Sequence, residues 1–590
     1  MSQSQSPGEY PGFHLPLNYT PSGRLFPNAI DCEKSDEPTG SRMRLTPLRE
    51  FTMMRLMNEI TDKPDWDSKI FDETIVAKWK AEALSADQGD VTQKMVDYCI
   101  AELRYKTKSY KKTGLVTAYD GDVVKSDVIV PEELRLALRA AAAPLEQVPA
   151  VDRDWHPDSD DLVLDLVHPS LFPVVYGTTR ILRNSTVTLD NCLAQCGSGE
   201  VIPVPDKPKA KARGAFYEAQ RNGYSQKFQW LPCDVEFTGD DDAVQITSYI
   251  NNLHPKKFKP LYNAIEKIIA KSIVLWNRTL DDRTPDVRVP FDGPEYEIQA
   301  ADQIPEQETD EDDDDYDQRV DDSYEDRRRA QELSIILPEP GEFSEPVEGD
   351  DVDILNLRED FKESGLQVIV KLANIHLTPE KPQYGGGSWH VEGQLNEHIC
   401  ATALYYYDCE NITESRLAFR QQSEAESCQQ MPYEQSHDMW LTQVYGCLNW
   451  QSSVQEVGDV LAKEGRLITF PNVFQHRVLP FKLADPTKPG HRKILALFLV
   501  DPHVKVISSA NVPCQRRDWW AKELEQSGAL PAKLPLEMKQ EVVGNMEDSD
   551  FPISLKEAKK LRLELMEERK HYGRIQDKQF NSTTFSLCEH

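Results

Sequence analysis

The stretch that decides the fold is residues 366–408, LQVIVKLANIHLTPEKPQYGGGSWHVEGQLNEHICATALYYYD. Its two ends, 366–377 and 399–408, are runs of β-branched and aromatic residues, and a segment rich in glycine and proline separates them. Similar short runs recur at 465–472 and 493–501. Short apolar runs separated by turn residues are typical of an all-β barrel or sandwich. We therefore predict that this part of the chain forms a β-rich core.

The segment between the first two predicted strands carries a pair of candidate metal ligands. His390 and Glu392 are two residues apart, and side chains at i and i+2 of an extended strand lie on one face. His476, in GRLITFPNVFQHRVLPF, follows a later predicted strand and supplies a third candidate. Two imidazoles and one carboxylate form a facial triad with open coordination positions, which typically holds non-haem Fe(II).

A candidate anchor for an organic acid lies 16 residues after His476. Arg492 opens the predicted strand GHRKILALFLVD, and its guanidinium is a planar fork of donors that matches a carboxylate. We expect it to grip the distal carboxylate of a 2-oxo diacid whose other end chelates the iron. A strand tyrosine adds a phenol donor, and alternation sends Tyr406 to one face and Tyr405 and Tyr407 to the other.

Together these motifs resemble the Fe(II)/2-oxoglutarate dioxygenase superfamily, and the local strings are most similar to its prolyl-hydroxylase branch. The resemblance covers about 366–503 and implies a double-stranded β-helix, also called a jelly roll. It also implies hydroxylation of a substrate with release of succinate and CO2. The residues that match the family's motifs are His390, Glu392 and His476 for the metal, and Arg492 and Tyr406 for 2-oxoglutarate.

The chain departs from the superfamily pattern in two places. The carboxylate ligand is Glu392 where Asp is commoner, and the gap between His476 and Arg492 is lengthened by KLADPTKPG. The whole chain also resembles a large uncharacterised fungal protein family, and that resemblance supplies no substrate.

Two other interpretations stay open at this point. One keeps the barrel but not the catalysis, so that the protein is a binding or scaffold module whose triad makes structural polar contacts. The other is a cupin-like metal enzyme that does not use 2-oxoglutarate. Such an enzyme shares the Gly465–Pro471–His476 turn pattern and has no need of Arg492. Metal content and 2-oxoglutarate binding discriminate among the three.

The remaining sequence predicts an α+β protein in five segments. Helical periodicity dominates the flanks, 1–150 and 511–590. Residues 151–300 form a mixed α/β segment that braces the barrel. Its clearest helix is LYNAIEKIIAKSIVLWNR, in which Ile265, Ile268, Ile269 and Ile273 lie on one stripe. The jelly-roll core takes 355–510, and an acidic insertion takes 301–354.

Most of the chain's negative charge lies in that insertion. The chain has 99 acidic and 67 basic side chains, a net charge of −32. Residues 301–353 alone hold 22 Asp and Glu against 4 Arg, a net charge of −18. Such a segment repels itself and buries little apolar area, so we expect a disordered insertion or solvated loop. If this acidic segment binds a partner, we expect that partner to be basic.

The overall composition excludes several classes of protein. An acidic chain does not suit a nucleic-acid binder that relies on a general basic surface. No run of about 18 apolar residues predicts a transmembrane helix, and the polar, proline-rich start does not look like a signal peptide. The 11 cysteines are scattered and odd in number, as in an intracellular chain with reduced thiols. We expect a cytoplasmic location, with the nucleus as the alternative.

Overall fold

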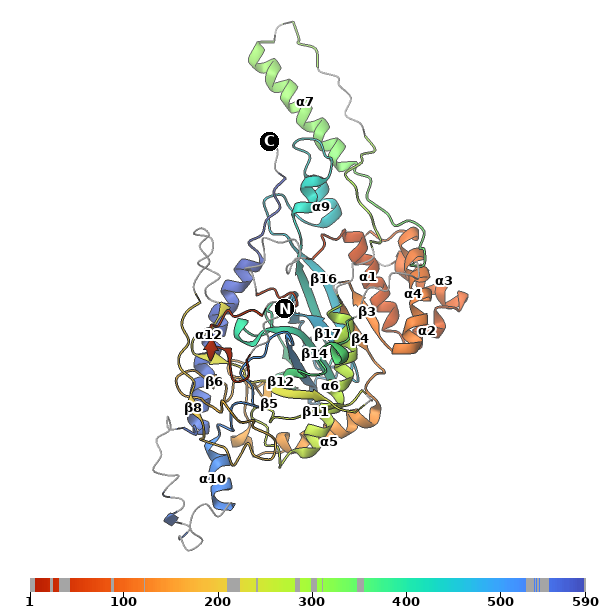
Figure 1. Ribbon diagram of the computed structural model, residues 1–590. Helices are drawn as coiled ribbons and strands as arrows, with labels where there is room; N and C mark the ends of the chain where they lie inside the picture. Colours follow the sequence, from red (N-terminus) through yellow and green to blue (C-terminus); the bar gives the residue numbers. More distant parts are fainter. Residues whose placement is uncertain are drawn as a thin grey trace.

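Figure 1 shows the computed structural model of the chain. The structure describes residues 6–21, 25–30, 43–85, 90–120, 122–208, 223–239, 242–281, 287–298, 305–309, 311–346, 355–526, 535, 537–538, 541 and 551–587. Within these residues the protein is a mixed α+β structure, as the sequence predicts, and it is built on a large antiparallel sheet.

The large sheet has nine strands, all paired antiparallel. β5 (Val163–Val167) also pairs with β12. The order of the other eight is β11 (Val244–Ile246), β10 (Cys233–Phe237), β12 (Leu366–Leu377), β20 (Gly490–Val500), β14 (Ile399–Glu410), β17 (Leu467–Pro471), β4 (Val123–Ser126) and β3 (Val116–Tyr119). The four strands predicted from the sequence therefore lie side by side at its centre.

A smaller sheet contains β16 (Val454–Leu461), β15 (Arg416–Gln422) and β18 (Gln475–Val478). Apolar side chains of the two sheets share one core, in which the rings of Phe419 and Phe470 are 5.1 Å apart. Four further strand pairs are two residues long: β1 with β2 (Tyr10–Pro11, His14–Leu15), β6 with β9 (Val174–Val175, Phe228–Gln229), β7 with β8 (Arg180–Ile181, Glu200–Val201) and β13 with β19 (Gln383–Tyr384, Phe481–Lys482).

Helices cover the opposite face of the large sheet. α5 (Glu132–Glu146) and α6 (Lys259–Thr279) pack against each other and against the sheet. The predicted isoleucine stripe of α6 is buried there, against alternate residues of β12 such as Val370 and Leu372. Because successive side chains of a strand point to opposite faces, the residues between them face the core that lies between the two sheets.

The remaining helices lie around this framework (Figure 1). Near the N-terminus α1 (Leu48–Thr61), α2 (Trp66–Lys69), α3 (Glu73–Ser85) and α4 (Gln93–Thr113) follow one another, as predicted, before the β3–β4 hairpin joins the large sheet. Short helices are α8 (Leu357–Asp360), α9 (Met439–Tyr445) and α10 (Arg517–Gln526). No helix of the described residues has the length and apolar character needed to cross a membrane.

The last long helix, α12 (Leu555–Phe580), closes one side of the core. Ser554 caps it by accepting a hydrogen bond from the Glu557 N–H at 3.1 Å. Leu561 and Leu565 are buried in the same core as the strands of both sheets. Arg562 pairs with Asp154 at 2.6 Å, so the helix is tied to the segment that precedes β5.

The predicted disorder of the acidic insertion is wrong for residues 313–333, which form the helix α7 (Asp313–Leu333). Asp312 caps it by accepting from the Asp315 N–H at 2.8 Å, and acidic residues in its first turn stabilise the positive end of the helix dipole. Arg319 pairs with Glu311 at 2.6 Å. Residues 301–304, 310 and 347–354 of the insertion lie outside the described residues.

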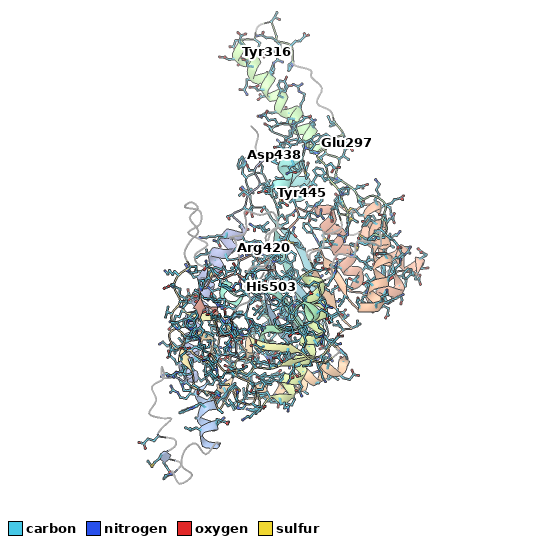
Figure 2. All side chains as sticks on the ribbon, viewed as in Figure 1. Glu297, Tyr316, Arg420, Asp438, Tyr445 and His503 are labelled. Carbon is cyan, nitrogen blue, oxygen red and sulfur yellow. The ribbon has the colours of Figure 1, made fainter. Side chains whose placement is uncertain are left out.

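The helix α7 projects away from the two sheets (Figure 1), and Tyr316 lies near its outer end (Figure 2). At its inner end the chain is held by a β-bridge between Tyr296 and Ile335 and by a hydrogen bond from the Met439 N–H to Glu332. Polar residues cover it nearly all round, which is the pattern of a helix that stands in solvent. Docking of a basic partner on this segment stays a prediction.

Candidate metal centre

Three of the predicted site residues meet at the edge of the small sheet. His390 and His476 are joined by an antiparallel β-bridge, with reciprocal backbone hydrogen bonds of 3.2 and 3.0 Å. Two residues further on, the backbone of Glu392 is fixed by the buried Asn472, whose amide exchanges hydrogen bonds with its N–H and C=O at 3.0 Å. The bridge and this amide bring the His-X-Glu pair to the distal histidine.

The side chains of these three residues converge. Oε1 of Glu392 lies 3.6 Å from Nε2 of His390 and 3.3 Å from Nε2 of His476. One ligand atom of each residue lies within 4.8 Å of the others. Nδ1 of His390 contacts the Ser388 carbonyl at 2.8 Å, and since a carbonyl only accepts, Nδ1 carries the proton. The Nε2 lone pair is then directed at the group, as a metal ligand requires.

Charge and burial shift the pKa values of all three residues. Burial opposes ionisation of Glu392, but the two imidazoles beside it hold its pKa well below the usual range. Burial lowers the pKa of His476 to about 4, so its imidazole is neutral near pH 7. Burial also acts to lower the pKa of His390, but its contact with Glu392 outweighs this and raises it. The side chain of His390 is 43% exposed, against 5% for His476, so the group opens outward at His390.

Arg492 is buried, with 3% of its surface exposed, and carries no counter-charge from the described residues. Its Nη1 donates to Ser415 Oγ at 2.6 Å, whereas its Nε has no hydrogen-bond partner. The guanidinium lies 5.6 Å from the ring of Tyr406 and 5.3 Å from that of Phe481. Because burying an unpaired cation is costly, this arrangement suits a residue that receives an anionic ligand.

The structure separates the three consecutive tyrosines as alternation predicts. Tyr406 lies in the core between the sheets, under Arg492, and burial raises its pKa. Tyr405 and Tyr407 lie in the core on the helical side. The hydroxyl of Tyr407 donates to Asn374 at 3.2 Å, which gives Asn374 a structural contact on that side.

Neighbouring polar residues have structural contacts of their own. Trp389 is stacked between the guanidinium groups of Arg477 and Arg420, at 4.4 and 4.8 Å. Glu397 accepts hydrogen bonds from the Trp230 N–H at 2.7 Å and from Arg569 at 2.6 Å. Packing against these two arginines is therefore the observed role of Trp389.

Sequence reasoning missed a second group that could hold a metal: His156, Asp165 and His168. The only signal was local, since Asp165 and His168 share the string DLVH, while His156 reaches them across a turn. Nδ1 of His156 lies 2.9 Å from Asp165, and Arg562 is 3.8 Å from the same oxygen. Nδ1 of His168 accepts the Ser170 N–H at 3.2 Å. This carboxylate is already partly neutralised, so the group at Glu392 suits a cation better.

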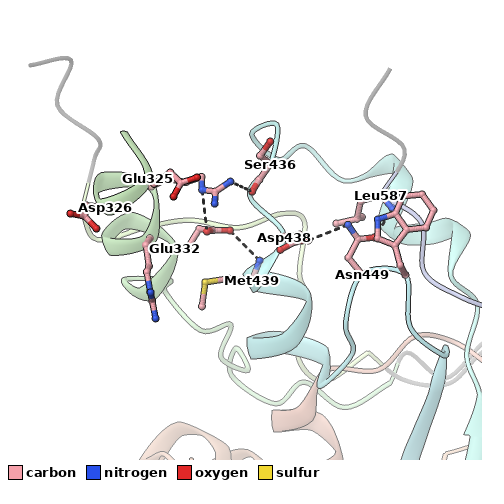
Figure 3. Close-up of a pocket in the computed structure, with 11 residues that line it drawn as sticks. Glu325, Asp326, Glu332, Ser436, Asp438, Met439, Asn449 and Leu587 are labelled. Carbon is pink, nitrogen blue, oxygen red and sulfur yellow. Dashed lines mark hydrogen bonds and ion pairs between the residues drawn. The ribbon is translucent and has the colours of Figure 1, made fainter. Parts of the chain in front are cut away.

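A cavity of 840 Å³ lies far from both groups, between α7 and α9 (Figure 3). Two hydrogen bonds join residues that line it: Arg328 donates to the Ser436 carbonyl at 3.3 Å, and Asn449 donates to Asp438 at 3.1 Å. No histidine or cysteine lines it, so it lacks the ligands typical of a transition-metal site. The lining residues are Glu325, Asp326, Arg328, Arg329, Glu332, Ser436, Asp438, Met439, Asn449, Trp450 and Leu587.

Two family models match the chain. One, described as a protein of unknown function (DUF4246), matches residues 93–523. The chain belongs to the DUF4246 family. A second model, the N-terminal domain of DUF4246, matches residues 10–82. The DUF4246 segment includes all five residues predicted for the site, but the family description carries no activity.

Solved structures add little to the DUF4246 assignment. The chain is similar to IDO from Bacillus thuringiensis at 13% identity and a TM-score of 0.15, over 26% of this chain and 50% of that one. A bsmA homolog from Methylobium petroleophilum PM1 is similar at 11% identity and a TM-score of 0.16, over 28% of this chain and 57% of that one. The DUF4246 chain thus spans about half the length of these proteins, and such low scores carry no argument. No curated protein matches the chain.

Proposed function

We propose that this protein is an Fe(II)- and 2-oxoglutarate-dependent oxygenase that hydroxylates an organic substrate. The observation that carries the proposal is the pairing of two features that face one core. These are the convergent group of His390, Glu392 and His476, and the buried, unpaired guanidinium of Arg492. An unpaired buried cation does not fit a scaffold whose polar groups make only structural contacts, nor a cupin-like enzyme that binds no organic acid.

We also propose that the strands of residues 355–510 form a double-stranded β-helix. In a jelly roll, successive strands pass back and forth between two facing sheets. The chain places β12, β14, β17 and β20 in the large sheet, and β15, β16 and β18 in the small one. His390, which lies between β12 and β14 in the sequence, forms a β-bridge with His476 of β18. This segment therefore adds an edge to the small sheet. This order supports the jelly-roll interpretation.

The donor set fits iron of the non-haem type. Two imidazoles and one carboxylate on one side leave the other coordination positions open for co-substrate and dioxygen. Bound iron would supply dioxygen activation coupled to decarboxylation of 2-oxoglutarate, which yields succinate, CO2 and a hydroxylated product. Metal ligands must be deprotonated. The fold keeps His476 neutral and Glu392 ionised, whereas His390, whose pKa is raised, gives up the proton on Nε2 when the metal binds.

In this proposal Arg492 binds the distal carboxylate of 2-oxoglutarate. Its free Nε and remaining N–H groups offer charge-assisted hydrogen bonds, which are strong where water is excluded. Ser415 holds one side of the guanidinium, while Tyr406 and Phe481 flank it with rings. The Tyr406 hydroxyl is assigned to the same carboxylate.

Metal and co-substrate binding test the proposal directly. Purified full-length chain loaded with Mn(II), as a redox-stable stand-in for Fe(II), should bind one ion and then one 2-oxoglutarate. His476→Ala should weaken metal binding by more than about 100-fold, because loss of an outer-shell partner alone typically costs 10–100-fold. Metal content by mass spectrometry and calorimetric titration provide the measurements.

The matched control is His376→Ala. His376 lies on β12 with its ring 6.3 Å from that of His491, and it is not one of the three convergent residues His390, Glu392 and His476. It should leave the metal stoichiometry unchanged. Wild-type chain that binds neither ion nor 2-oxoglutarate would contradict the proposal and favour a scaffold role. Metal binding without any 2-oxoglutarate binding would favour the cupin-like alternative.

A further inference from the structure

A short N-terminal segment, residues 25–30, packs against the part of the chain that carries two of the candidate metal ligands. This segment lies within the match to the N-terminal family model, whereas all five predicted site residues lie within the match to the DUF4246 model. Ala29 and Ile30 are buried in one apolar cluster with Val391. The metal group therefore has a neighbour from outside the DUF4246 match.

The position of Val391 shows which side of the ligand pair this segment covers. Val391 stands between His390 and Glu392, whose side chains converge with that of His476. Its own side chain packs instead with Ile30. Because neighbouring side chains of extended backbone point to opposite faces, the N-terminal segment lies behind the ligand pair and leaves the metal-binding face open.

Asn472 connects this segment to Glu392 through hydrogen bonds. Its fully buried side chain accepts from the Glu392 N–H and donates to the Glu392 carbonyl, both at 3.0 Å. The backbone carbonyl of Asn472 in turn accepts the Ala29 N–H at 3.1 Å. The residue that fixes the backbone of Glu392 is therefore itself held by the N-terminal segment.

Asn28 adds a second connection at the start of β14. Its Nδ2 donates to the Ile399 carbonyl at 2.7 Å, and Nδ2 of Asn472 donates to the same carbonyl at 3.0 Å. Oδ1 of Asn28 accepts the Ile30 N–H at 2.9 Å, which fixes the orientation of the amide. Two side-chain amides thus share one acceptor, and one of them is the amide that holds Glu392.

We propose that Asn28 is a positioning residue of the metal centre. Together with Ala29 it holds Asn472, and through Asn472 it keeps Glu392 in the place that metal binding requires. Ordering a loose segment on binding costs free energy, so a ligand that is held in advance binds the metal more tightly. This inference rests on the proposed function and gives the N-terminal segment a part in that site.

Asn28→Asp is the sharpest test, because it keeps the acceptor for the Ile30 N–H and removes the donor to Ile399. In the full-length chain it should weaken Mn(II) binding about tenfold, the lower end of the effect for residues that orient a metal ligand from outside. Calorimetry measures this affinity. At saturating Co(II), the visible absorption spectrum of the bound ion should also change, since it depends on the ligand geometry. Asn28→Ala, which adds no charge, should give the same two results.

The matched control is Asn191→Asp. Asn191 makes the same two kinds of hydrogen bond within its own segment: Nδ2 donates to the Thr186 carbonyl at 3.2 Å, and Oδ1 accepts the Thr188 N–H at 2.8 Å. The control should leave Mn(II) affinity and the Co(II) spectrum as in wild type. The urea-unfolding midpoints of the two metal-free Asn→Asp variants should be alike.

The opposite outcomes are distinguishable. Equal Mn(II) affinity in wild type and Asn28→Asp would refute the role of Asn28 and leave the proposed function intact. An unaltered Co(II) spectrum, or a midpoint far below that of Asn191→Asp, would mean that Asn28 supports only the general stability of the fold. Wild-type chain that binds no Mn(II) would overturn the proposed function and this inference together.

Discussion

At the scale of single residues, the strongest indication of function is a cation without a partner. Replacing Arg492 by Met removes a buried charge that no described carboxylate neutralises, so the ligand-free chain should lose no stability or gain some. Affinity for 2-oxoglutarate should fall roughly 10- to 150-fold, in line with about 1.5–3 kcal/mol for hydrogen bonds to charged groups. Thermal unfolding and calorimetry of the Mn(II)-loaded chain measure the two effects.

Arg477→Met is the control for this substitution, because Arg477 also has no ion-pair partner among the described residues but stacks on Trp389 at 4.4 Å. It should leave 2-oxoglutarate binding intact. A large drop in the melting temperature of Arg492→Met, with co-substrate binding preserved, would mean that the arginine is structural.

The candidate ligands His390 and Glu392 could be predicted as a pair from the sequence because their geometry is local. His390 and Glu392 share a face through the two-residue period of a strand, and the same period separates Tyr406 from its neighbours. The unpaired state of Arg492 is not local, since it depends on which carboxylates the fold brings near. The group at Asp165 escaped notice for the same reason, because His156 reaches it only through tertiary contact.

At the scale of elements, α12 contributes one apolar face to the core that the strands share. Leu565 is 1% exposed within that core, whereas Leu563 on the same helix is 54% exposed. Leu565→Ala should destabilise the protein by about 2–5 kcal/mol, because it leaves a cavity, and Leu563→Ala by less than about 0.5 kcal/mol. Urea unfolding of both variants measures the difference, and equal effects would show that α12 does not close the core.

The acidic helix α7 shows why composition alone misjudged an element. The expectation of disorder followed from self-repulsion and lack of apolar surface, and it ignored local capping. The side chain of Asp312, the acidic first turn and the pair between Arg319 and Glu311 stabilise the helix without any buried face. By contrast, the predicted isoleucine stripe of α6 is confirmed, because helical periodicity is a short-range signal.

At the scale of the whole molecule, one apolar core joins segments far apart in the sequence. It includes Phe51 of α1, Phe470 of β17 and Leu565 of α12. Ion pairs follow the same plan: Arg466, fully buried at the start of the core strand β17, holds Asp127 at 2.6 Å and Asp62 at 2.8 Å. Length alone suggests about four domains, but these contacts join the N-terminal helices to the sheets.

Acid should lower the free energy of unfolding of the protein over a defined pH range. Burial lowers the pKa of His168 from 6.5 to about 3, so the fold favours the neutral imidazole. The stability it contributes is complete above pH 6.5 and is lost as the pH falls towards 3. Between pH 6.5 and 5 the free energy of unfolding should fall by about 2 kcal/mol from this group alone, at about 1.4 kcal/mol per pH unit.

His168→Gln should flatten that part of the pH profile, measured by urea unfolding at pH 7 and pH 5. The control is His571→Gln, which changes an exposed histidine of α12 and should leave the profile unaltered. If the loss of stability persists unchanged in His168→Gln, another buried group is responsible, with His376 as the next candidate since burial lowers its pKa to about 4.

The sequence by itself determined the β-rich core, the helical flanks and the pairing of His390 with Glu392, because strand and helix periods are properties of neighbouring residues. Only the tertiary structure decided which distant groups meet. It brought His476 to Glu392 through a β-bridge, left Arg492 without a counter-charge among the described residues, and set Asp165 against β12. Burial and pairing of charges depend on contacts between segments that lie hundreds of residues apart, and no local pattern encodes them.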